Sequence, residues 1–342
     1  KGLDYQTAYE FQARAADVLE QVESEVQVVK ASPGFDWGKD DFAFHIPVYI
    51  QGVKVTPDVG QNLLINPLFT VNQRGSTTYA ITKPAYTLDG WKTSGDTKAG
   101  EVVVGQRYAK LTNTSGTLGL GQFVEDYGAL AGETVTLSMA VDILSGSYHL
   151  GLNDGTGQAG EVLSQKGLQV YALTATLSDS PSQLWCQLIS EGAASCRIFG
   201  AKLEVGDHQT LAIQGGDGTW QLTQQPNPEE ILRCYRYQYV PVEGDNSYPM
   251  GYGFAFSNTS ARMMFPCGVK MRIAPSVTFL NGSALSGIGI FNNGASHTPT
   301  AVAGTRNLPG GVGVIFTTSG LVTNDVCTLR SISGKLLFDA NL

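Results

Sequence analysis

Alternating apolar and polar residues over positions 134–144 constrain the fold more than any other feature of this chain. Successive side chains of a β-strand point to opposite faces, so a period of two predicts a strand with one buried face. The side chains on that face are all apolar: Val135, Leu137, Met139, Val141 and Ile143. We therefore expect β-sheet structure around this segment.

Further short runs of this kind follow, and Gly, Asn, Asp or Ser separates them. They lie at 148–152, 168–177, 184–189 and 197–205. Several short strands at such spacing predict a β-sandwich or jelly roll. The 41 glycines and 15% charged residues of the 342-residue chain suit turn-rich β-structure. We predict a mainly β protein with a jelly-roll domain at 62–209.

A second β-sandwich is predicted at 229–342, after a linker at 210–228 that contains glycine-rich and proline-rich stretches. Pro228 followed by two glutamates predicts the first turn of a short helix, because Pro fits the first helical position and acids favour the positive end of the dipole. Strands are predicted at 234–240, 250–256, 276–280, 287–291, 312–316 and 327–332, with a long loop at 292–311.

In the strand predicted at 234–240, tyrosines occupy every second position: Tyr235, Tyr237 and Tyr239. On a strand they would share one face, in the core or a subunit interface.

A helical period is found in residues 1–32, which end at a Ser-Pro-Gly stop. Its apolar stripe comprises Ala8, Phe11, Ala15, Val18, Val22 and Val29. Such a stripe must pack on something: the helix either folds back onto its own chain or forms a parallel bundle with neighbouring chains, of a number that the heptads leave open. Residues 33–61 are predicted to be a connector with a short strand at 48–55.

Charge and composition exclude several partners. A net charge of −8 without any cluster of Lys and Arg argues against nucleic acid. No apolar run approaches the roughly 20 residues that span a bilayer, so we expect no membrane insertion. The cysteines form no CxxC pair and no metal-ligand spacing, and we predict free, partly buried thiols and no metal or cofactor. They are Cys186, Cys196, Cys234, Cys267 and Cys327.

Catalytic motifs are nearly absent. The GxGxxG match at 155–160 precedes a strand pattern and predicts a hairpin turn, not a phosphate site. The sequence has no GxSxG, P-loop or HExxH motif, and its histidines are far apart: His45, His149, His208 and His297. Paired acids could hydrolyse a glycoside, but we favour a solvated turn or a structural cation site for the candidates, which are Asp40, Asp41, Glu125, Asp126 and Asp154. We predict a protein without enzymatic activity.

Aromatic side chains support glycan binding, because sugars stack their CH-rich faces on Trp and Tyr. In the jelly roll the candidate rings are Tyr86, Trp91, Tyr108 and Trp185. Trp91 and Trp185 also fit a core position, which is the commoner place for such rings, and we favour the core for both.

Several stretches resemble bacteriophage tail fibres and other tail receptor-binding proteins, with their carbohydrate-binding-module-like β-sandwich. They are Asn-Leu-Leu-Ile-Asn-Pro-Leu-Phe at 62–69, Asn-Gln-Arg-Gly at 72–75, residues 199–207, Pro-Glu-Glu to Cys-Tyr-Arg-Tyr at 228–237, residues 265–279 and the ending at 338–342. Asn341 stands where the family pattern has an acidic residue. The resemblance covers most of 62–342 and not the first sixty residues.

The resemblance implies a virion protein, assembled in the host cytoplasm, that attaches the phage tail to a bacterial surface glycan or outer-membrane receptor. It favours the helical bundle as an oligomerisation stalk, in an elongated homotrimer bound to other tail or baseplate proteins through the N-terminal region. The alternatives are a glycan-active enzyme or cellular carbohydrate-binding module, and a structural baseplate or capsid decoration protein.

In such a fibre residues 229–342 would be the distal tip, and its loops would carry the receptor site. The two longest irregular stretches, 242–251 and 292–311, contain most of the candidates. With an adjoining tyrosine these are Asp245, Asn246, Tyr248, Tyr252, Asn292, Asn293, His297 and Arg306.

Overall fold

The computed structural model describes residues 49–50, 53–54, 60–96, 99–224, 227–241, 249–280, 284–332 and 335–341. The chain divides into two compact units, residues 1–60 and 61–342. In the first, β1 (Tyr49–Ile50) and β2 (Val53–Lys54) pair antiparallel. The single strand predicted at 48–55 is therefore wrong, because the chain reverses within it. The helix predicted over 1–32 lies outside the described residues.

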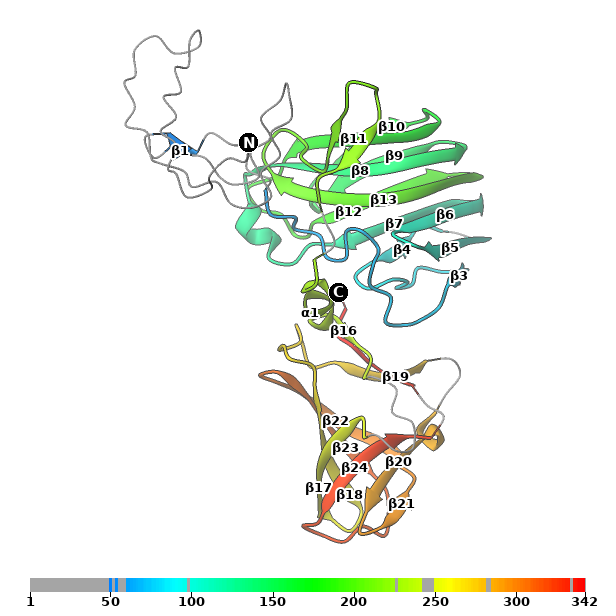
Figure 1. Cartoon of the computed structure of the whole chain (residues 1–342), viewed down its shortest axis with the longest axis vertical. Helices are drawn as coiled ribbons and strands as arrows, with labels where there is room; N and C mark the ends of the chain where they lie inside the picture. Colours follow the sequence, from blue (N-terminus) through cyan, green and yellow to red (C-terminus); the bar gives the residue numbers. More distant parts are fainter. Residues whose placement is uncertain are drawn as a thin grey trace, which may run out of the picture. The chain divides into compact units, whose positions relative to one another are not determined.

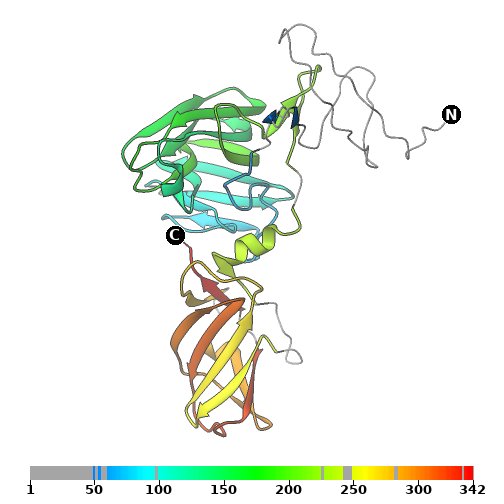
Figure 2. The same ribbon diagram turned by 90° about the vertical axis from the view of Figure 1, so that its left-hand side faces the viewer.

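The second unit is mainly β, and its first part is a sandwich of two antiparallel sheets (Figures 1 and 2). One sheet has the order β10-β9-β12-β7-β4, and the other β11-β8-β13-β6-β5-β3. The strands are β3 (Thr78–Ile81), β4 (Lys92–Ser94), β5 (Ala99–Gly105), β6 (Tyr108–Ser115), β7 (Thr117–Phe123), β8 (Thr134–Ser145), β9 (Tyr148–Asn153), β10 (Gln158–Leu163), β11 (Gly167–Thr176), β12 (Trp185–Glu191) and β13 (Ala194–Val205), with a 3-10 turn η1 (Tyr127–Leu130) after β7.

The apolar residues whose alternation predicted β8 lie in the core of this sandwich. Leu137 and Val141 are fully buried, and they share one apolar cluster with Leu118 and Leu120 from β7 of the facing sheet. Each such side chain contributes about 1.5–3 kcal/mol by leaving water. Trp91 is also fully buried, as the core interpretation predicted.

This sandwich also buries charged side chains. Lys202 and Glu204 on β13 form an ion pair at 3.0 Å, and each is only 2% exposed. Thr210 bridges them, since its hydroxyl accepts from Lys202 Nζ and donates to Glu204 Oε2. Asp89 is fully buried and accepts from the backbone and side chain of Gln73. Burial in a low-dielectric site raises the pKa of Asp89 above its usual range.

Between the two sandwiches the chain is not a plain linker. The predicted linker at 210–228 contains a hairpin of β14 (Ala212–Gln214) and β15 (Trp220–Leu222). The short helix predicted after Pro228 is confirmed as α1 (Glu230–Tyr235). It replaces the strand predicted at 234–240, of which only β16 (Gln238–Tyr239) remains.

The three alternating tyrosines therefore do not share a strand face, so this part of the prediction is wrong, whereas a core position is confirmed for Tyr237 and Tyr239. Tyr235 ends α1, whereas Tyr237 and Tyr239 are buried after it. The same segment places Ile231, Cys234 and Tyr235 at helical spacing. The chain forms the helix that this spacing predicts and not the strand that the alternation predicts.

The second sandwich pairs a seven-stranded sheet, β21-β20-β24-β17-β18-β23-β22, with a three-stranded sheet, β16-β25-β19. Both sheets contribute to one apolar core. The strands are β17 (Gly251–Ser257), β18 (Ser260–Pro266), β19 (Ser276–Leu280), β20 (Ile288–Asn292), β21 (Ala295–His297), β22 (Ala301–Leu308), β23 (Gly311–Thr317), β24 (Val326–Ser331) and β25 (Lys335–Asp339), with a 3-10 turn η2 (Leu285–Gly287) before β20.

The loop predicted at 292–311 is wrong, because it contains β21 and β22. Asn293 and Gly294 both have positive φ, 47° and 78°, as a two-residue hairpin turn of the type favoured by Asn-Gly requires. β22 is an edge strand with few large apolar residues, so it gave no clear strand pattern.

A set of polar contacts joins segments that the tail-fibre resemblance singled out. Glu230 of α1 accepts from the backbone N–H of Asn66 at 2.7 Å. Gln73 donates to the carbonyl of Gln238 and accepts from the N–H of Val240. Further along, Arg74 pairs with Asp339 at 3.3 Å. The motifs at 62–69, 72–75, 228–237 and 338–342 thus meet in space, directly or through the residues that follow 237, although they are far apart in sequence.

All five cysteines are buried free thiols. Burial raises the pKa of each, most simply at Cys186, where no other influence acts. Within the described residues no helix is both long and apolar enough to cross a membrane.

Candidate functional site

The outer face of the five-stranded sheet is the first place where unusual side chains gather. Because Leu118 and Leu120 face the core, the alternate residues of β7 point outward. These are Gly119, Gly121 and Phe123, and the strand register sets Phe123 beside Trp185 of β12. The same face bears Gln187 on β12 and Asn153 on β9.

Glycine is needed on β7 because atoms of the neighbouring strands β12 and β4 lie close to it on this face. A Cβ atom at Gly121 would lie 2.7 Å from the Trp185 ring and 2.4 Å from the carbonyl oxygen of Cys186. One at Gly119 would lie 2.4 Å from the hydroxyl of Ser94, which donates to Gln187 at 2.8 Å. The missing side chains let Trp185 and Gln187 lie close to the sheet.

Three rings and one cation meet at one end of this face. The rings of Phe123 and Trp185 are 4.5 Å apart between centroids, tilted by 51°. Lys92 Nζ lies 5.2 Å from the centre of the Tyr86 ring and 5.4 Å from that of Phe123. We call Tyr86, Lys92, Phe123 and Trp185 the Phe123 cluster. Trp185 is only 8% exposed, so it mainly supports Phe123, which is half-buried.

A cleft of about 340 Å³ adjoins this cluster, and Phe123 lines it. Its walls come from residues 61–65, the segment from Gln122 to η1, and α1 with the residues after it. Volumes of roughly 300–1,000 Å³ are typical of ligand sites. The polar groups that converge on it are Gln61, Asn62, Gln122, Glu125, Asp126, Arg233, Arg236 and Tyr237.

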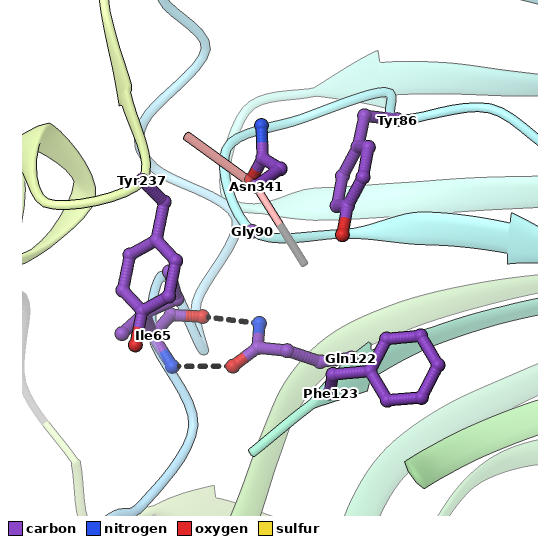
Figure 3. Close-up of a pocket in the computed structure, with 7 residues that line it drawn as sticks. All are labelled: Ile65, Tyr86, Gly90, Gln122, Phe123, Tyr237 and Asn341. Carbon is purple, nitrogen blue, oxygen red and sulfur yellow. Dashed lines mark hydrogen bonds between the residues drawn. The ribbon is translucent and has the colours of Figure 1, made fainter. Parts of the chain in front are cut away.

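Figure 3 shows a small second pocket beside the cleft, with Tyr86 and Phe123 on one side and Tyr237 on the other. The side-chain amide of Gln122 is fixed there, because it accepts from the N–H of Ile65 and donates to its carbonyl. The two pockets share Ile65, Gln122, Phe123 and Tyr237. The Phe123 cluster and the cleft therefore form one continuous candidate site.

Two charged groups of the cleft, Glu125 and Arg236, pair with each other. Arg236 Nη2 donates to both oxygens of Glu125, at 3.1 and 2.9 Å, and the Tyr237 hydroxyl donates to Glu125 Oε2 at 2.6 Å. Burial and this carboxylate raise the pKa of Tyr237 well above its usual range, so the phenol stays protonated. Arg233 is held by the carbonyls of Asn62 and Leu64. Such a site can orient hydroxyl groups by hydrogen bonds.

The other predicted carboxylate, Asp154, has a structural place in the β9–β10 turn. Its Oδ1 accepts from the N–H and hydroxyl of Thr156 and from the N–H of Gly157, and its Oδ2 accepts from Ser178 N–H. These donors hold its pKa below the usual range. Asp40 and Asp41 lie outside the described residues. Among the described residues no three His, Cys, Asp or Glu side chains form a group that could bind a metal ion.

The four aromatic candidates of the jelly roll lie at three different locations. Tyr86 and Trp185 come together in the Phe123 cluster. Trp91 lies in the core, where its indole N–H donates to the carbonyl of Asn66. Tyr108 lies on the other sheet, against Phe199. Glu125 and Asp126, two of the predicted carboxylates, line the cleft. Phe123, Lys92 and the other cleft residues were missed, because strand register and the approach of α1 bring them together.

The receptor-site candidates predicted in the tip, residues 229–342, are not all described by the structure. Three of them lie outside the described residues: Asp245, Asn246 and Tyr248. Asn292 is buried, so its predicted exposure is wrong: its side chain donates to the carbonyl of Val326 and accepts from Val322 N–H, which ties two strand ends together.

Of the remaining tip candidates, Tyr252 and Arg306 share the outer face of the seven-stranded sheet, and the other two lie in or after the β20–β21 turn. Asn293 is exposed in the β20–β21 turn, and His297 is half-buried at the end of β21. Tyr252 and Arg306 are exposed on β17 and β22 of the seven-stranded sheet.

No protein-family model matches the chain, and no curated protein matches it significantly. Solved structures are similar to part of it. The carbohydrate-binding module TmCBM61, in complex with β-1,4-galactotriose, is 17% identical over 43% of this chain and 99% of its own, with a TM-score of 0.30. The C-terminal family 22 carbohydrate-binding module of Clostridium thermocellum Xyn10B is 15% identical over 40% of this chain and 90% of its own, with a TM-score of 0.26.

The enzymatically active domain of tailspike protein 4 from bacteriophage CBA120 is 11% identical. The match covers 44% of this chain but 22% of the tailspike, with a TM-score of 0.30. At these identities and TM-scores the likenesses do not identify a function.

Proposed function

We propose that this chain binds a glycan non-covalently at the Phe123 cluster and the adjoining cleft. The observation that carries the proposal is the junction of the rings of Tyr86 and Phe123 with a cleft of about 340 Å³. A sugar ring stacks on an aromatic face, while its hydroxyl groups need fixed donors and acceptors. Both requirements are met at neighbouring positions.

The polar part of the site is preorganised. The Gln122 amide is locked by Ile65, and Glu125 is oriented by Arg236 and Tyr237. Groups that already hold their positions lose little conformational freedom when a ligand binds. Because Glu125 accepts hydrogen bonds from two neighbours, its role in the proposal is to orient a sugar and not to cleave one.

We further propose that glycan binding serves attachment of a phage tail fibre to a bacterial surface. The support is the sequence resemblance, whose motifs at 62–69 and 228–237, and at 72–75 and 338–342, are joined by hydrogen bonds and an ion pair. In a trimer several weak sites would act together, and avidity would exceed the affinity of one site by orders of magnitude. A trimer in sedimentation analysis of the intact chain is the expected result, and a monomer would contradict this part.

The glycan proposal is tested by a glycan array with the intact chain, followed by affinity measurements on the strongest neutral glycan. Phe123→Ala removes the stacking ring, and we expect about a two- to tenfold loss of affinity, since a stacked ring contributes on the order of 0.5–1.5 kcal/mol. Phe199→Ala is the matched control, because Phe199 pairs with Tyr108 on the other sheet.

Equal affinity of Phe123→Ala and the native chain would contradict the site. Release of reducing ends from a bound polysaccharide would contradict non-covalent binding as the whole function and would point to the enzyme alternative.

A further inference from the structure

The seven-stranded sheet of the second sandwich has an outer face of unusual composition. Its strands contain three arginines and no Asp or Glu: Arg262, Arg306 and Arg330. Residues 249–342 hold six Lys and Arg but only two carboxylates, in a chain whose net charge is −8. This part of the protein is therefore basic within an acidic chain.

Large apolar side chains share the outer face with the arginines. Met263 and Phe265 point into the core, so the alternate residues of β18 point outward, and those of β17 follow from the register. The exposed set consists of Tyr252, Phe254, Phe256, Met264 and Val326. Tyr252, at 54% exposed, is the most accessible ring among them. A contiguous exposed patch of this kind marks an interaction site.

Two of the three arginines lie over aromatic rings. The guanidinium of Arg262 lies 5.9 Å from the centre of the Phe254 ring and 5.5 Å from that of Phe256. That of Arg330 lies 4.5 Å from the Phe291 ring. A guanidinium that stacks by its face keeps its N–H groups in the plane, where they can donate to a carboxylate or phosphate.

The strand register aligns one row of this face across the whole sheet. It runs through Ser296, Phe291, Thr328, Tyr252, Met264, Gly313 and Arg306. At about 4.8 Å per strand the row is roughly 29 Å long. It has rings in its middle and an arginine at one end, and Arg262 lies on the neighbouring row.

We propose that this arginine face, the outer face of the seven-stranded sheet, binds an acidic polysaccharide through carboxylate or phosphate groups. The charge favours an anion, since the described strands offer it no opposing carboxylate. A second copy fits less well, because a self-complementary contact would set arginine against arginine. Nucleic acid fits less well too, because three cations in an acidic chain are few for its phosphate density.

This inference rests on the proposed function only in that both ligands are glycans; the face and its residues are separate from the Phe123 site. The probes are polygalacturonate, which carries carboxylates, a phosphate-bearing lipopolysaccharide, and neutral dextran of similar size. The intact chain is expected to bind at least one anionic probe and not dextran at this face. Arg262→Gln should weaken that binding about tenfold, and Phe254→Ala should weaken it several-fold.

Lys270→Gln is the control, because Lys270 is an exposed cation of the same sandwich that lies outside the seven strands. It should bind like the native chain. Phe123→Ala separates the two proposals, since it should leave binding of the anionic probe unchanged. If Phe123→Ala abolishes anionic binding and Arg262→Gln does not, the inference fails and the Phe123 site stands. If Arg262→Gln weakens binding of the anionic probe and Phe123→Ala weakens binding of no glycan, the inference stands and the Phe123 site fails.

Three other results would overturn the inference. The first is that the native chain binds neither anionic probe. The second is that Phe254→Ala lowers the oligomeric state in sedimentation analysis, which would make the face an interface between copies. The third is that duplex DNA displaces polygalacturonate at equal concentration of charge, which would make nucleic acid the partner.

Discussion

The two sandwiches have similar architecture but use charge in opposite ways. The first shields the Lys202–Glu204 pair and Asp89 from solvent almost completely. The second buries no charged side chain among the described residues of its sheets, yet three arginines lie on its larger sheet. A buried pair must be matched closely to offset desolvation, whereas a surface cation remains available to a ligand. The comparison separates charges that maintain a structure from charges that can recognise a partner.

The largest effect should come from breaking the buried pair. Lys202→Met leaves Glu204 buried without its cation, and we expect the free energy of unfolding to fall by about 3–5 kcal/mol. Denaturant unfolding followed by tryptophan fluorescence measures this, since Trp91 and Trp185 lie in the same sandwich.

The double variant Lys202→Met/Glu204→Leu should recover most of that loss, because no unpaired charge remains. Arg262→Gln, on the surface of the other sandwich, should change stability by no more than about 0.5 kcal/mol. If the single and double variants are equally unstable, the buried charge is not the cause.

A smaller effect is expected from salt. Raising NaCl from 0.05 to 0.5 M shortens the Debye length from about 14 to about 4 Å. Binding of polygalacturonate to the arginine face should weaken roughly three- to tenfold, whereas binding of a neutral glycan at the Phe123 cluster should stay constant. Titrations of the two ligands at both salt concentrations measure this difference in salt dependence. An equal salt dependence of both would contradict the distinction between the two sites.

The smallest effect on stability is expected for Asp154, whose carboxylate closes the β9–β10 turn by accepting hydrogen bonds. Its folded-state pKa is lowered, so its stabilisation is fully present above the unfolded value of about 3.9 and is lost as pH falls through the folded value. Asp154→Asn should lower stability by about 1 kcal/mol or less at pH 7. The difference from the native chain should shrink below pH 4 in thermal unfolding, and a constant difference down to pH 2 would contradict the assignment.

Sequence predicted the strands well where one face is buried and the other is not. β8 was found at 134–144 because its core residues alternate without interruption. The same rule failed after Pro228, where helical and alternating spacings coexist around Cys234 and tertiary contacts of Glu230 and Arg233 favour the helix. It failed again at β22, an edge strand whose residues need not be apolar.

The candidate site was predictable only in part. Tyr86 and Trp185 could be named as rings, but nothing local shows that Lys92 and Phe123 stand between them. That arrangement depends on the register of three strands. The cleft depends on Arg236 reaching Glu125 across 111 positions of sequence, a distance over which residue patterns carry no signal.

The five buried cysteines have a practical consequence for handling and labelling the protein. Thiols with raised pKa values that lie beneath the surface react slowly with air, alkylating reagents and other thiols. Storage without reductant should therefore cause little cross-linking. A single cysteine introduced on the surface would be the preferred target of a maleimide dye, so fluorophores could be attached at chosen positions without removing any native residue.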